Sequence, residues 1–295
     1  MTSWSGSVQG PYPIGNPSAQ PDLLFAFPSP KTGARDQSCR LIVRPDLWAR
    51  QMRLRFSNSL GTRPVTFDDI HVGLQRTAAA LVVGSNQPVT FAGESATAVG
   101  PGSSVWSDPV ILPFVHDPAT AELLGPKLAV SFHVVGESGP ITWHAKALTT
   151  SYLTAPGAGA KGESEDEYAF PFGTASWYFL DALDMMVPAD ARGIVAFGDS
   201  ISDGTASTMN GDDRGPDVLA RRFARSTATD RGGERRHRRQ PGGGACRLFG
   251  AEALFRRAVG QRPARPRCAV AIPHRRRGLA RRHQRFRQER QCLGR

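Results

Sequence analysis

QMRLRFSNSLGTRPVTFDDIHVGLQ, residues 51–75, carries the pattern that decides the fold of the first half of the chain. Apolar side chains alternate with arginines at Met52, Leu54 and Phe56, a Gly-Thr-Arg-Pro turn follows, and the alternation resumes at Val65. Alternation with period two is typical of strands that bury one face. The stretch therefore predicts a β-hairpin.

The same alternation of apolar and polar residues extends over residues 20–155. LAVSFHVV (128–135) and ITWHAKALTTSYL (141–153) repeat it on either side of a GESGP turn, and no helical periodicity interrupts it. Several short strands in about 135 residues predict an antiparallel β-sandwich. His133 and His144 occupy alternating strand positions, where a lone histidine is usually a packing or surface residue. We assign neither of them any chemistry.

The flanks of this predicted domain carry weaker signals. Residues 1–19 are interpreted as an N-terminal extension and 156–192 as a linker, because small residues, Pro and Gly break the alternation. The linker contains an acidic run, Glu163, Glu165, Asp166 and Glu167. This run could bind a cation or form a solvated surface, and we favour the surface. Cys39 stands alone before residue 224, so we expect a thiol there and no disulfide. No metal or other cofactor is expected.

A different pattern begins at residue 193. GIVAFGDSISDG (193–204) opens with four consecutive apolar residues, which predict a parallel strand covered on both faces. Ser200 then stands at the carboxyl end of that strand, where open α/β sheets place their ligands, and Gly198 permits a sharp turn. Pro216 predicts the first turn of a following helix.

The residues Phe197 to Gly204, FGDSISDG, resemble the first sequence block of the GDSL, or SGNH, hydrolases, a family of esterases and lipases. SWYFLDALDMMVPADARGIVAFGDSISDG, the preceding RLRFSN and TWHAKALTTSY, and the later RGPDVLARRF resemble bacterial two-domain members with an N-terminal β-sandwich. The resemblance implies a flavodoxin-like α/β hydrolase domain beginning at 193–223. It also implies that Ser200 is the nucleophile of an acyl-enzyme mechanism and that Asp199 shapes its turn.

The basic character of the chain resides in its end. Residues 224–295 contain 21 arginines, no lysine and four acidic residues, a net charge of +17, whereas the whole chain carries +11. All five tryptophans and all four tyrosines precede this tail. Such a composition cannot build an ordinary core, so we expect the tail to be poorly ordered.

The tail also resembles coding DNA read in the wrong frame. Codons chosen for Glu234–Gly242, read one base later, spell Asn-Ala-Gly-Ile-Gly-Gly-Asn-Leu, which resembles the glycine block of the family. The same step applied to Leu279–Cys292 yields Gly-Ile-Asn-Asp, the asparagine block. We therefore interpret the chain as frameshifted near Arg221–Ser226. On this interpretation the wrong reading frame produces His237, His274 and His283, so they are not candidate bases. The Asp-x-x-His of the family is missing.

These patterns support three functional hypotheses. The first is a carboxylic-ester hydrolase acting on a small ester or acylated carbohydrate, expected to be inactive in this chain. The second is a β-sandwich that binds carbohydrate or is purely structural; Trp106 or Trp143 would stack on a glycan if exposed, but core packing is favoured for both. The third is a nucleic-acid-binding arm, from which we expect only nonspecific binding. We expect no membrane span, and the patterns leave the compartment open.

Overall fold

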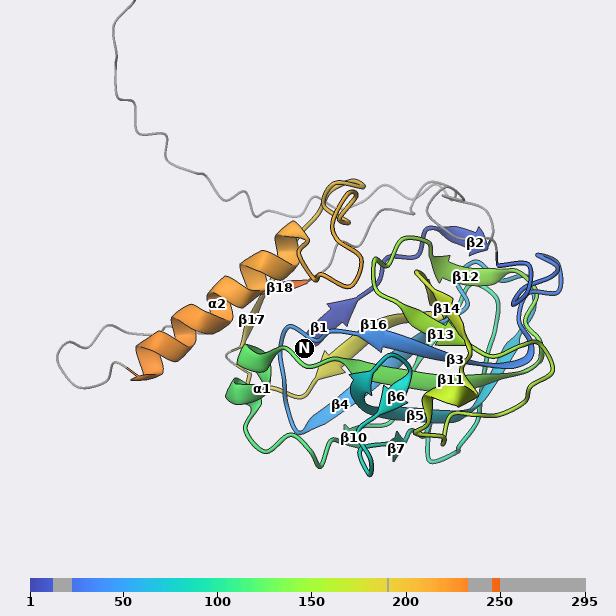
Figure 1. The fold of residues 1–295 in the computed structure, drawn as a ribbon, viewed down its shortest axis with the longest axis horizontal. Helices are drawn as coiled ribbons and strands as arrows, with labels where there is room; N and C mark the ends of the chain where they lie inside the picture. Colours follow the sequence, from blue (N-terminus) through green and yellow to red (C-terminus); the bar gives the residue numbers. More distant parts are fainter. Residues whose placement is uncertain (13–22, 190, 233–245, 250–295) are drawn as a thin grey trace, which may run out of the picture. The chain divides into compact units, whose positions relative to one another are not determined.

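Strands dominate the described part of the chain. The computed structural model describes residues 1–12, 23–189, 191–232 and 246–249 (Figure 1). All of them lie in one unit, Met1–Phe255, and the second unit, Arg256–Arg295, lies outside the described residues. The prediction that the tail is poorly ordered falls almost entirely on residues outside the description.

Three antiparallel sheets are built from strands that lie between Thr2 and Met185, and we call this part of the chain the β region. The first has five strands: β1 (Thr2–Ser5), β16 (Leu180–Met185), β4 (Gln51–Ser57), β10 (Val110–Ile111) and β9 (Ser104–Trp106). The second has eight: β14 (Phe172–Thr174), β13 (Ser151–Leu153), β3 (Arg35–Val43), β11 (Leu128–Glu137), β5 (Val65–Thr77), β6 (Ala80–Leu81), β7 (Gln87–Pro88) and β8 (Thr97–Val99). The third has three: β15 (Trp177–Tyr178), β12 (Ile141–His144) and β2 (Gly10–Tyr12).

An aromatic core joins the first two sheets. The ring of Phe56, on β4, lies 5.1 Å from Phe67 on β5 and 5.0 Å from Phe132 on β11, centroid to centroid. All three side chains are fully buried. The region is mostly β, as the sequence predicts. It is also sandwich-like, because the two sheets bury their inner faces against each other.

The predicted hairpin at 51–75 is wrong. Both strands form, but β4 belongs to the five-stranded sheet and β5 to the eight-stranded one, so they face each other across the core. The connection from Asn58 to Pro64 is a crossing loop, and Asn58 Nδ2 holds it by donating to the carbonyl oxygens of Arg63 (2.8 Å) and Val99 (3.0 Å). Alternation of apolar and polar residues shows that a strand buries one face. The same alternation is expected whether two strands pair in one sheet or face each other across the core.

A β-bulge explains why the apolar pattern of β5 changes phase. Asp69 and Ile70 together lie opposite Phe132, because His133 pairs with Asp68 and Ser131 pairs with His71. Asp69 adopts a φ of 46°, which turns the strand. Ile70 consequently returns to the core face and is buried, three residues after Phe67.

The β region extends beyond 20–155 on both sides. β1 and β2 lie in the predicted N-terminal extension, and β14, β15 and β16 lie in the predicted linker. β16 sits between β1 and β4. These strands have only two to six residues, so their alternation is too short to be recognised alone.

One short helix interrupts the strands of 20–155, a stretch in which the sequence shows no helical periodicity. α1 (Pro118–Leu124) begins after Asp117, whose side chain accepts a hydrogen bond from the Ala119 N–H, and ends at Gly125 in the left-handed conformation. Two turns are too short to establish a helical period, but the Asp-Pro start and the glycine end are helix signals. Outside 20–155, a 3₁₀ turn spans Glu167–Ala169, and α2 spans Gly215–Gly232.

Two side chains of the acidic run accept backbone hydrogen bonds. Glu165 Oε1 accepts a hydrogen bond from the Gly84 N–H (2.8 Å), and Asp166 Oδ1 accepts one from the Tyr168 N–H (3.0 Å). Among the residues that the structure describes, no three His, Cys, Asp or Glu side chains are grouped so that they would hold a metal ion. Glu165 thus attaches the segment 156–166 to the loop at Gly84, and Asp166 caps the 3₁₀ turn that follows it.

Beneath that segment lies a fully buried arginine. Arg40 Nε donates to Ser131 Oγ (2.8 Å), Nη1 donates to the Ala79 carbonyl (2.7 Å), and Nη2 donates to the Ser164 carbonyl. The guanidinium also stacks 4.1 Å from the centroid of the Phe170 ring. Burial lowers the pKa of Arg40 to about 10, against the charges of Glu165 and Asp69, which raise it.

The neighbouring Asp69–His71 pair shifts both of its titrations. Burial alone would raise the pKa of Asp69, but hydrogen bonds from His71 and the Gly162 N–H, together with the charges of His71 and His133, outweigh it and lower the pKa. Burial alone would lower the pKa of His71, but hydrogen bonds to Asp69 and its charge outweigh it and raise the pKa. The ring Nδ1 lies 3.3 Å from Asp69 Oδ1.

We therefore expect a pH window of stability from this pair. The His71 contribution is complete below its ordinary pKa of 6.5 and is lost as the pH rises through its folded value. The Asp69 contribution is complete above 3.8 and is lost as the pH falls. His71→Gln should remove up to about 1 kcal/mol of unfolding free energy at pH 5 and less at pH 9, measured by urea unfolding. His116→Gln, at an exposed histidine, is the control, and equal losses at both pH values would contradict the assignment.

Candidate functional site

The segment that resembles the hydrolase motif forms a closed turn after a short strand. β17 (Arg192–Val195) is followed by Gly198-Asp199-Ser200, and the Asp199 side chain accepts a hydrogen bond from the Ile201 N–H (2.9 Å). The Ser200 carbonyl accepts one from the Thr205 N–H (2.8 Å). Ser200 itself is exposed on this turn. The polypeptide thus places a serine hydroxyl in solvent beyond the carboxyl end of a strand.

Two glycines of the motif are required for different reasons. An ideal Cβ on Gly198 would lie 1.9 Å from Ser202 Oγ, so the side chain of Ser202 packs where any larger residue would stand. Gly204 has a φ of 103°, which other residues rarely adopt, and Arg214 packs against it. The sharp turn predicted at Gly198 therefore reflects a close side-chain approach, and the special backbone conformation belongs to Gly204.

The described histidines make their contacts away from Ser200. His71 contacts Asp69, and His133 lies between Asp68 (2.6 Å) and Asp36 (3.0 Å). His144 contacts Ser7 and Asp203. Within the described ranges, no histidine forms a hydrogen bond with Ser200. His237, His274 and His283 lie outside the described residues.

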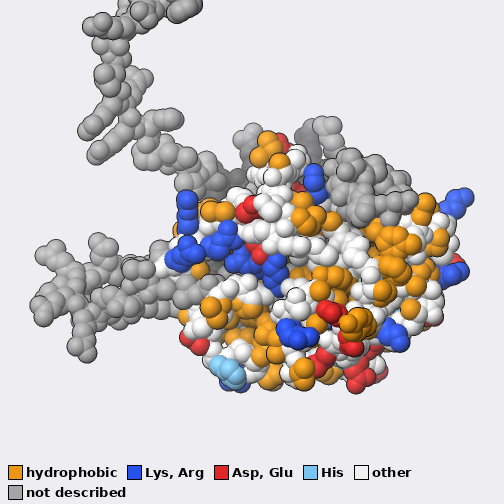
Figure 2. Space-filling view, viewed as in Figure 1, with side chains coloured by type: hydrophobic (Ala, Val, Ile, Leu, Met, Phe, Trp, Pro, Cys, Tyr) orange, Lys and Arg blue, Asp and Glu red, His pale blue; other side chains and the backbone are white. Residues whose placement is uncertain are grey.

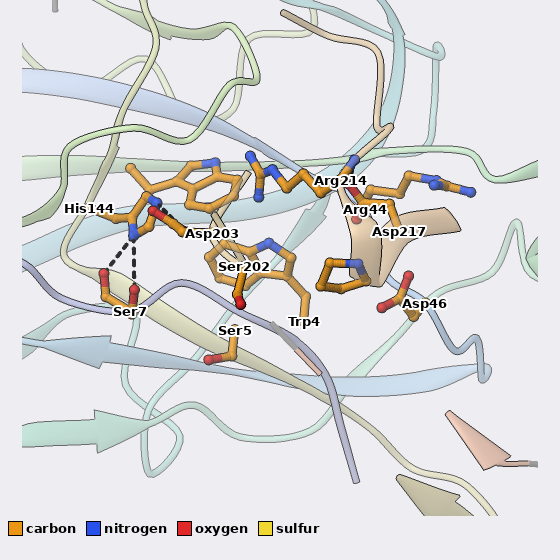
Figure 3. A pocket seen from close by; sticks show the side chains of 12 residues that line it. Trp4, Ser5, Ser7, Arg44, Asp46, His144, Ser202, Asp203, Arg214 and Asp217 are labelled. Carbon is orange, nitrogen blue, oxygen red and sulfur yellow. Dashed lines mark hydrogen bonds and ion pairs between the residues drawn. The ribbon is translucent and has the colours of Figure 1, made fainter. Parts of the chain in front are cut away.

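A polar pocket adjoins the turn and takes in Ser202 and Asp203, but not Ser200 (Figure 3). The β region contributes to its walls Trp4, Ser5, Ser7, Arg44, Asp46, His144 and Trp177, and the segment before and at the start of α2 contributes Arg214, Pro216 and Asp217. Its cavity of about 40 Å³ has room for about three water molecules and not for an acylated sugar.

His144 is the most buried titratable side chain of this pocket, only 3% exposed. Its Nδ1 lies 2.6 Å from the Ser7 carbonyl oxygen and 3.2 Å from Ser7 Oγ, and its Nε2 lies 3.3 Å from Asp203 Oδ1. A carbonyl oxygen can only accept, so Nδ1 carries the hydrogen and donates it to the Ser7 carbonyl. It therefore cannot take a proton from the Ser7 hydroxyl. Despite their residue types, Ser7, His144 and Asp203 do not have the roles of a catalytic triad.

The far side of the pocket mixes charges of both signs. Burial raises the pKa of Asp217, the charge of Arg214 opposes this rise, and the charge of Asp212 adds to it. Arg214 also stands 5.5 Å from the centroid of the Trp177 ring. With Arg44, Asp46 and Asp203 on the same walls, the pocket has no excess of positive charge that would mark it as an anion site.

The apolar run of β17 is not covered on both faces as predicted. Val195 is 63% exposed and Phe197 is 68% exposed. In the described residues β17 has one partner, β18 (Cys246–Phe249), with which it pairs in parallel. A parallel strand with an apolar surface needs neighbours and helices on both faces, and the described pair lacks most of them.

α2 joins these two strands. It begins at Gly215, one residue before Pro216, and buries only the small side chains of Ala220 and Ala224 in its described half. Figure 2 shows Lys and Arg side chains gathered near this helix. β17, α2 and β18 thus follow one another as a strand, a helix and a parallel strand.

The tryptophans considered for glycan stacking have other contacts. Trp143 is 1% exposed and packs with Tyr12 and Tyr178, so it belongs to the core. Trp106 is half-buried, and the guanidinium of Arg53 covers its ring at 4.3 Å from the centroid. Trp143 therefore offers no open face for stacking, and Arg53 already stacks on the ring of Trp106.

No protein-family model and no curated protein sequence matches this chain. No helix in the described ranges is long and apolar enough to cross a membrane. From sequence alone, His144 is one of two histidines on predicted strands, and Asp203 is one residue of the motif. Gln9 has no role that the sequence indicates. It lies about 190 positions before Asp203, so no local pattern reveals that the two side chains are in contact.

Proposed function

We propose that residues 193–223 begin a serine ester-hydrolase domain of the SGNH type, with Ser200 as its nucleophile. One observation carries the proposal: the hydroxyl of Ser200 is exposed on a tight turn between a strand and the helix that leads to a parallel strand. That is the position in which α/β hydrolases present an attacking serine. Asp199 supports the assignment by closing the turn through its side chain.

The reaction would take place in two steps. Ser200 Oγ attacks the ester carbonyl carbon, its proton passes to a base, and the bond to the alcohol breaks to leave an acyl-enzyme. Water then attacks the acyl group, and the carboxylic acid leaves with Ser200 restored. The substrate class is a small ester or acylated carbohydrate. The base and the second oxyanion donor are the groups that the frameshift hypothesis assigns to the corrected reading frame.

The chain as written should therefore hydrolyse p-nitrophenyl acetate no faster than buffer does. The reason is that no described histidine forms a hydrogen bond with Ser200. His71, His133 and His144 are held by other residues, and no hydrogen bond joins the exposed His116 to Ser200. Release of p-nitrophenolate measures the rate, and Ser200→Ala is the matched control. Turnover well above buffer that disappears in the alanine variant would show that another histidine serves as the base and that our interpretation of the tail is wrong.

A further inference from the structure

The turn that carries Ser200 is closed on itself and attached to the β region at one side chain. The Asp203 N–H donates to the Asp199 carbonyl (3.0 Å), and the Thr205 N–H donates to the Ser200 carbonyl (2.8 Å). The Asp203 carboxylate leaves this turn and enters the polar pocket (Figure 3). Whatever fixes Asp203 therefore also fixes the backbone of Ser200.

Two side chains of the β region receive the two oxygens of Asp203. Gln9 Nε2 donates to Oδ2 at 3.0 Å, and His144 Nε2 lies 3.3 Å from Oδ1. His144 is buried, and within the described residues its Nε2 makes no hydrogen bond in good geometry, so the carboxylate is its polar neighbour. The hydrogen bond from Gln9 therefore holds the carboxylate, and His144 lies beside its other oxygen.

Hydrogen bonds join the segment that contains Gln9 to the segment that contains His144. Gln9 Oε1 accepts a hydrogen bond from the Ala145 N–H (3.0 Å), and the Gln9 N–H donates to the Trp143 carbonyl (2.9 Å). His144 Nδ1 donates to the Ser7 carbonyl. The residues that receive Asp203 thus belong to a rigid junction between the segment before β2 and the end of β12.

Later residues of the segment attach elsewhere and serve as a comparison. The Asn210 side chain accepts a hydrogen bond from the Thr150 N–H (2.7 Å), and Lys127 Nζ lies 3.0 Å from Asp212 Oδ2. These contacts lie outside the turn from Asp199 to Thr205. Within that turn, Asp203 is the residue whose side chain bonds to the β region.

We propose that Asp203 is a positioning residue for Ser200, and that the amide of Gln9 in the β region holds it. The inference rests on the proposed function for the role of Ser200, whereas the attachment itself rests on the contacts above. The β region would then be part of the scaffold of the active site, which differs from the hypothesis of a separate binding module.

The pair Gln9 and Asp203 allows an exchange of amide and carboxylate. Gln9→Glu places two carboxylates together, while its Oε1 still accepts the Ala145 N–H. Adding Asp203→Asn supplies an amide donor to the new carboxylate and restores one donor and one acceptor. The double variant has the atoms of the original pair in reversed places, so it tests the contact and not merely the presence of a large side chain.

Amide hydrogen exchange at Thr205, measured by NMR on the full chain, is the test. We expect Gln9→Glu to accelerate this exchange by about tenfold or more, the loss of one hydrogen bond to a charged group, and the double variant to restore it within about threefold. Lys127→Gln, which breaks a contact outside the turn, should leave the exchange unchanged. The midpoint of thermal unfolding identifies any variant that acts by general destabilisation.

Two outcomes would overturn the proposal. Exchange at Thr205 that Gln9→Glu leaves unchanged would show that the attachment does not fix the turn, and acceleration that persists in the double variant would show that the Gln9–Asp203 contact is not its cause. Neither outcome bears on whether Ser200 is a nucleophile, which is judged by esterase activity. Conversely, an inactive Ser200 in a corrected chain would leave the exchange result intact and refute the proposed function.

Discussion

Restoring the reading frame near Arg221–Ser226 is expected to yield an esterase whose activity depends on Ser200. The corrected chain should reach an Asp-x-x-His pair and gain at least about three orders of magnitude over the chain as written, the scale on which a serine depends on its base. p-Nitrophenyl acetate hydrolysis measures the gain, and Ser200→Ala in the corrected chain should abolish it. An indel in the codons for 221–226 is the matching observation in the DNA.

The exposed apolar side chains of β17 provide an independent readout of the same correction. Val195 and Phe197 are more than half exposed beside a single described neighbour. New strands from the corrected frame should cover them, so binding of a hydrophobic dye should fall while cooperative unfolding should extend to this segment. A shifted frame that meets stop codons within a few dozen triplets and contains no Asp-x-x-His would refute the frameshift hypothesis.

Removing the buried arginine should have the largest effect on stability. Arg40→Ala deletes the donors to Ser131, Ala79 and Ser164 and leaves a cavity beside Phe170. Buried acceptors without partners cost the full desolvation penalty, so we expect a loss of about 3–5 kcal/mol in unfolding free energy. Urea unfolding monitored by tryptophan fluorescence measures the loss.

Arg53→Ala is the matched control for Arg40. Arg53 also contacts an aromatic ring and a polar partner, Asp184 at 2.8 Å, but its side chain is 40% exposed. We expect it to cost about 1 kcal/mol or less. Equal losses in the two variants would contradict the idea that burial makes Arg40 critical. Arg40→Lys should recover little of the loss, because one ammonium cannot reach three acceptors in the planar geometry of a guanidinium.

The strands were predictable from the sequence and their partners were not. Alternation at Met52, Leu54 and Phe56 identifies β4 and its buried face correctly. It carries no information on whether the next strand lies beside it or across the core, because burial of alternate residues satisfies both arrangements. In the structure the Asn58 side chain holds the crossing loop by two hydrogen bonds, and no periodicity in the sequence indicates such contacts.

The candidate site was predictable to the same limited degree. The glycine, aspartate and serine of the motif mark a turn at Gly198–Ser200 from local sequence alone. Gln9, which donates to Asp203, and His144, which lies beside it, are far from the turn in the chain. Only the three-dimensional arrangement brings them to Asp203, so no local pattern could identify them.

The pairing of β1 with β16 has a consequence for how the protein is made. Thr2–Ser5 is synthesised before its partner Leu180–Met185, which follows some 180 residues later. Contacts of such long sequence separation form slowly, because a long loop must close before they stabilise anything. During synthesis, β4 likewise waits for β16. The five-stranded sheet therefore cannot assemble cotranslationally until nearly the whole β region has emerged, and its inner face stays open to chaperones until then.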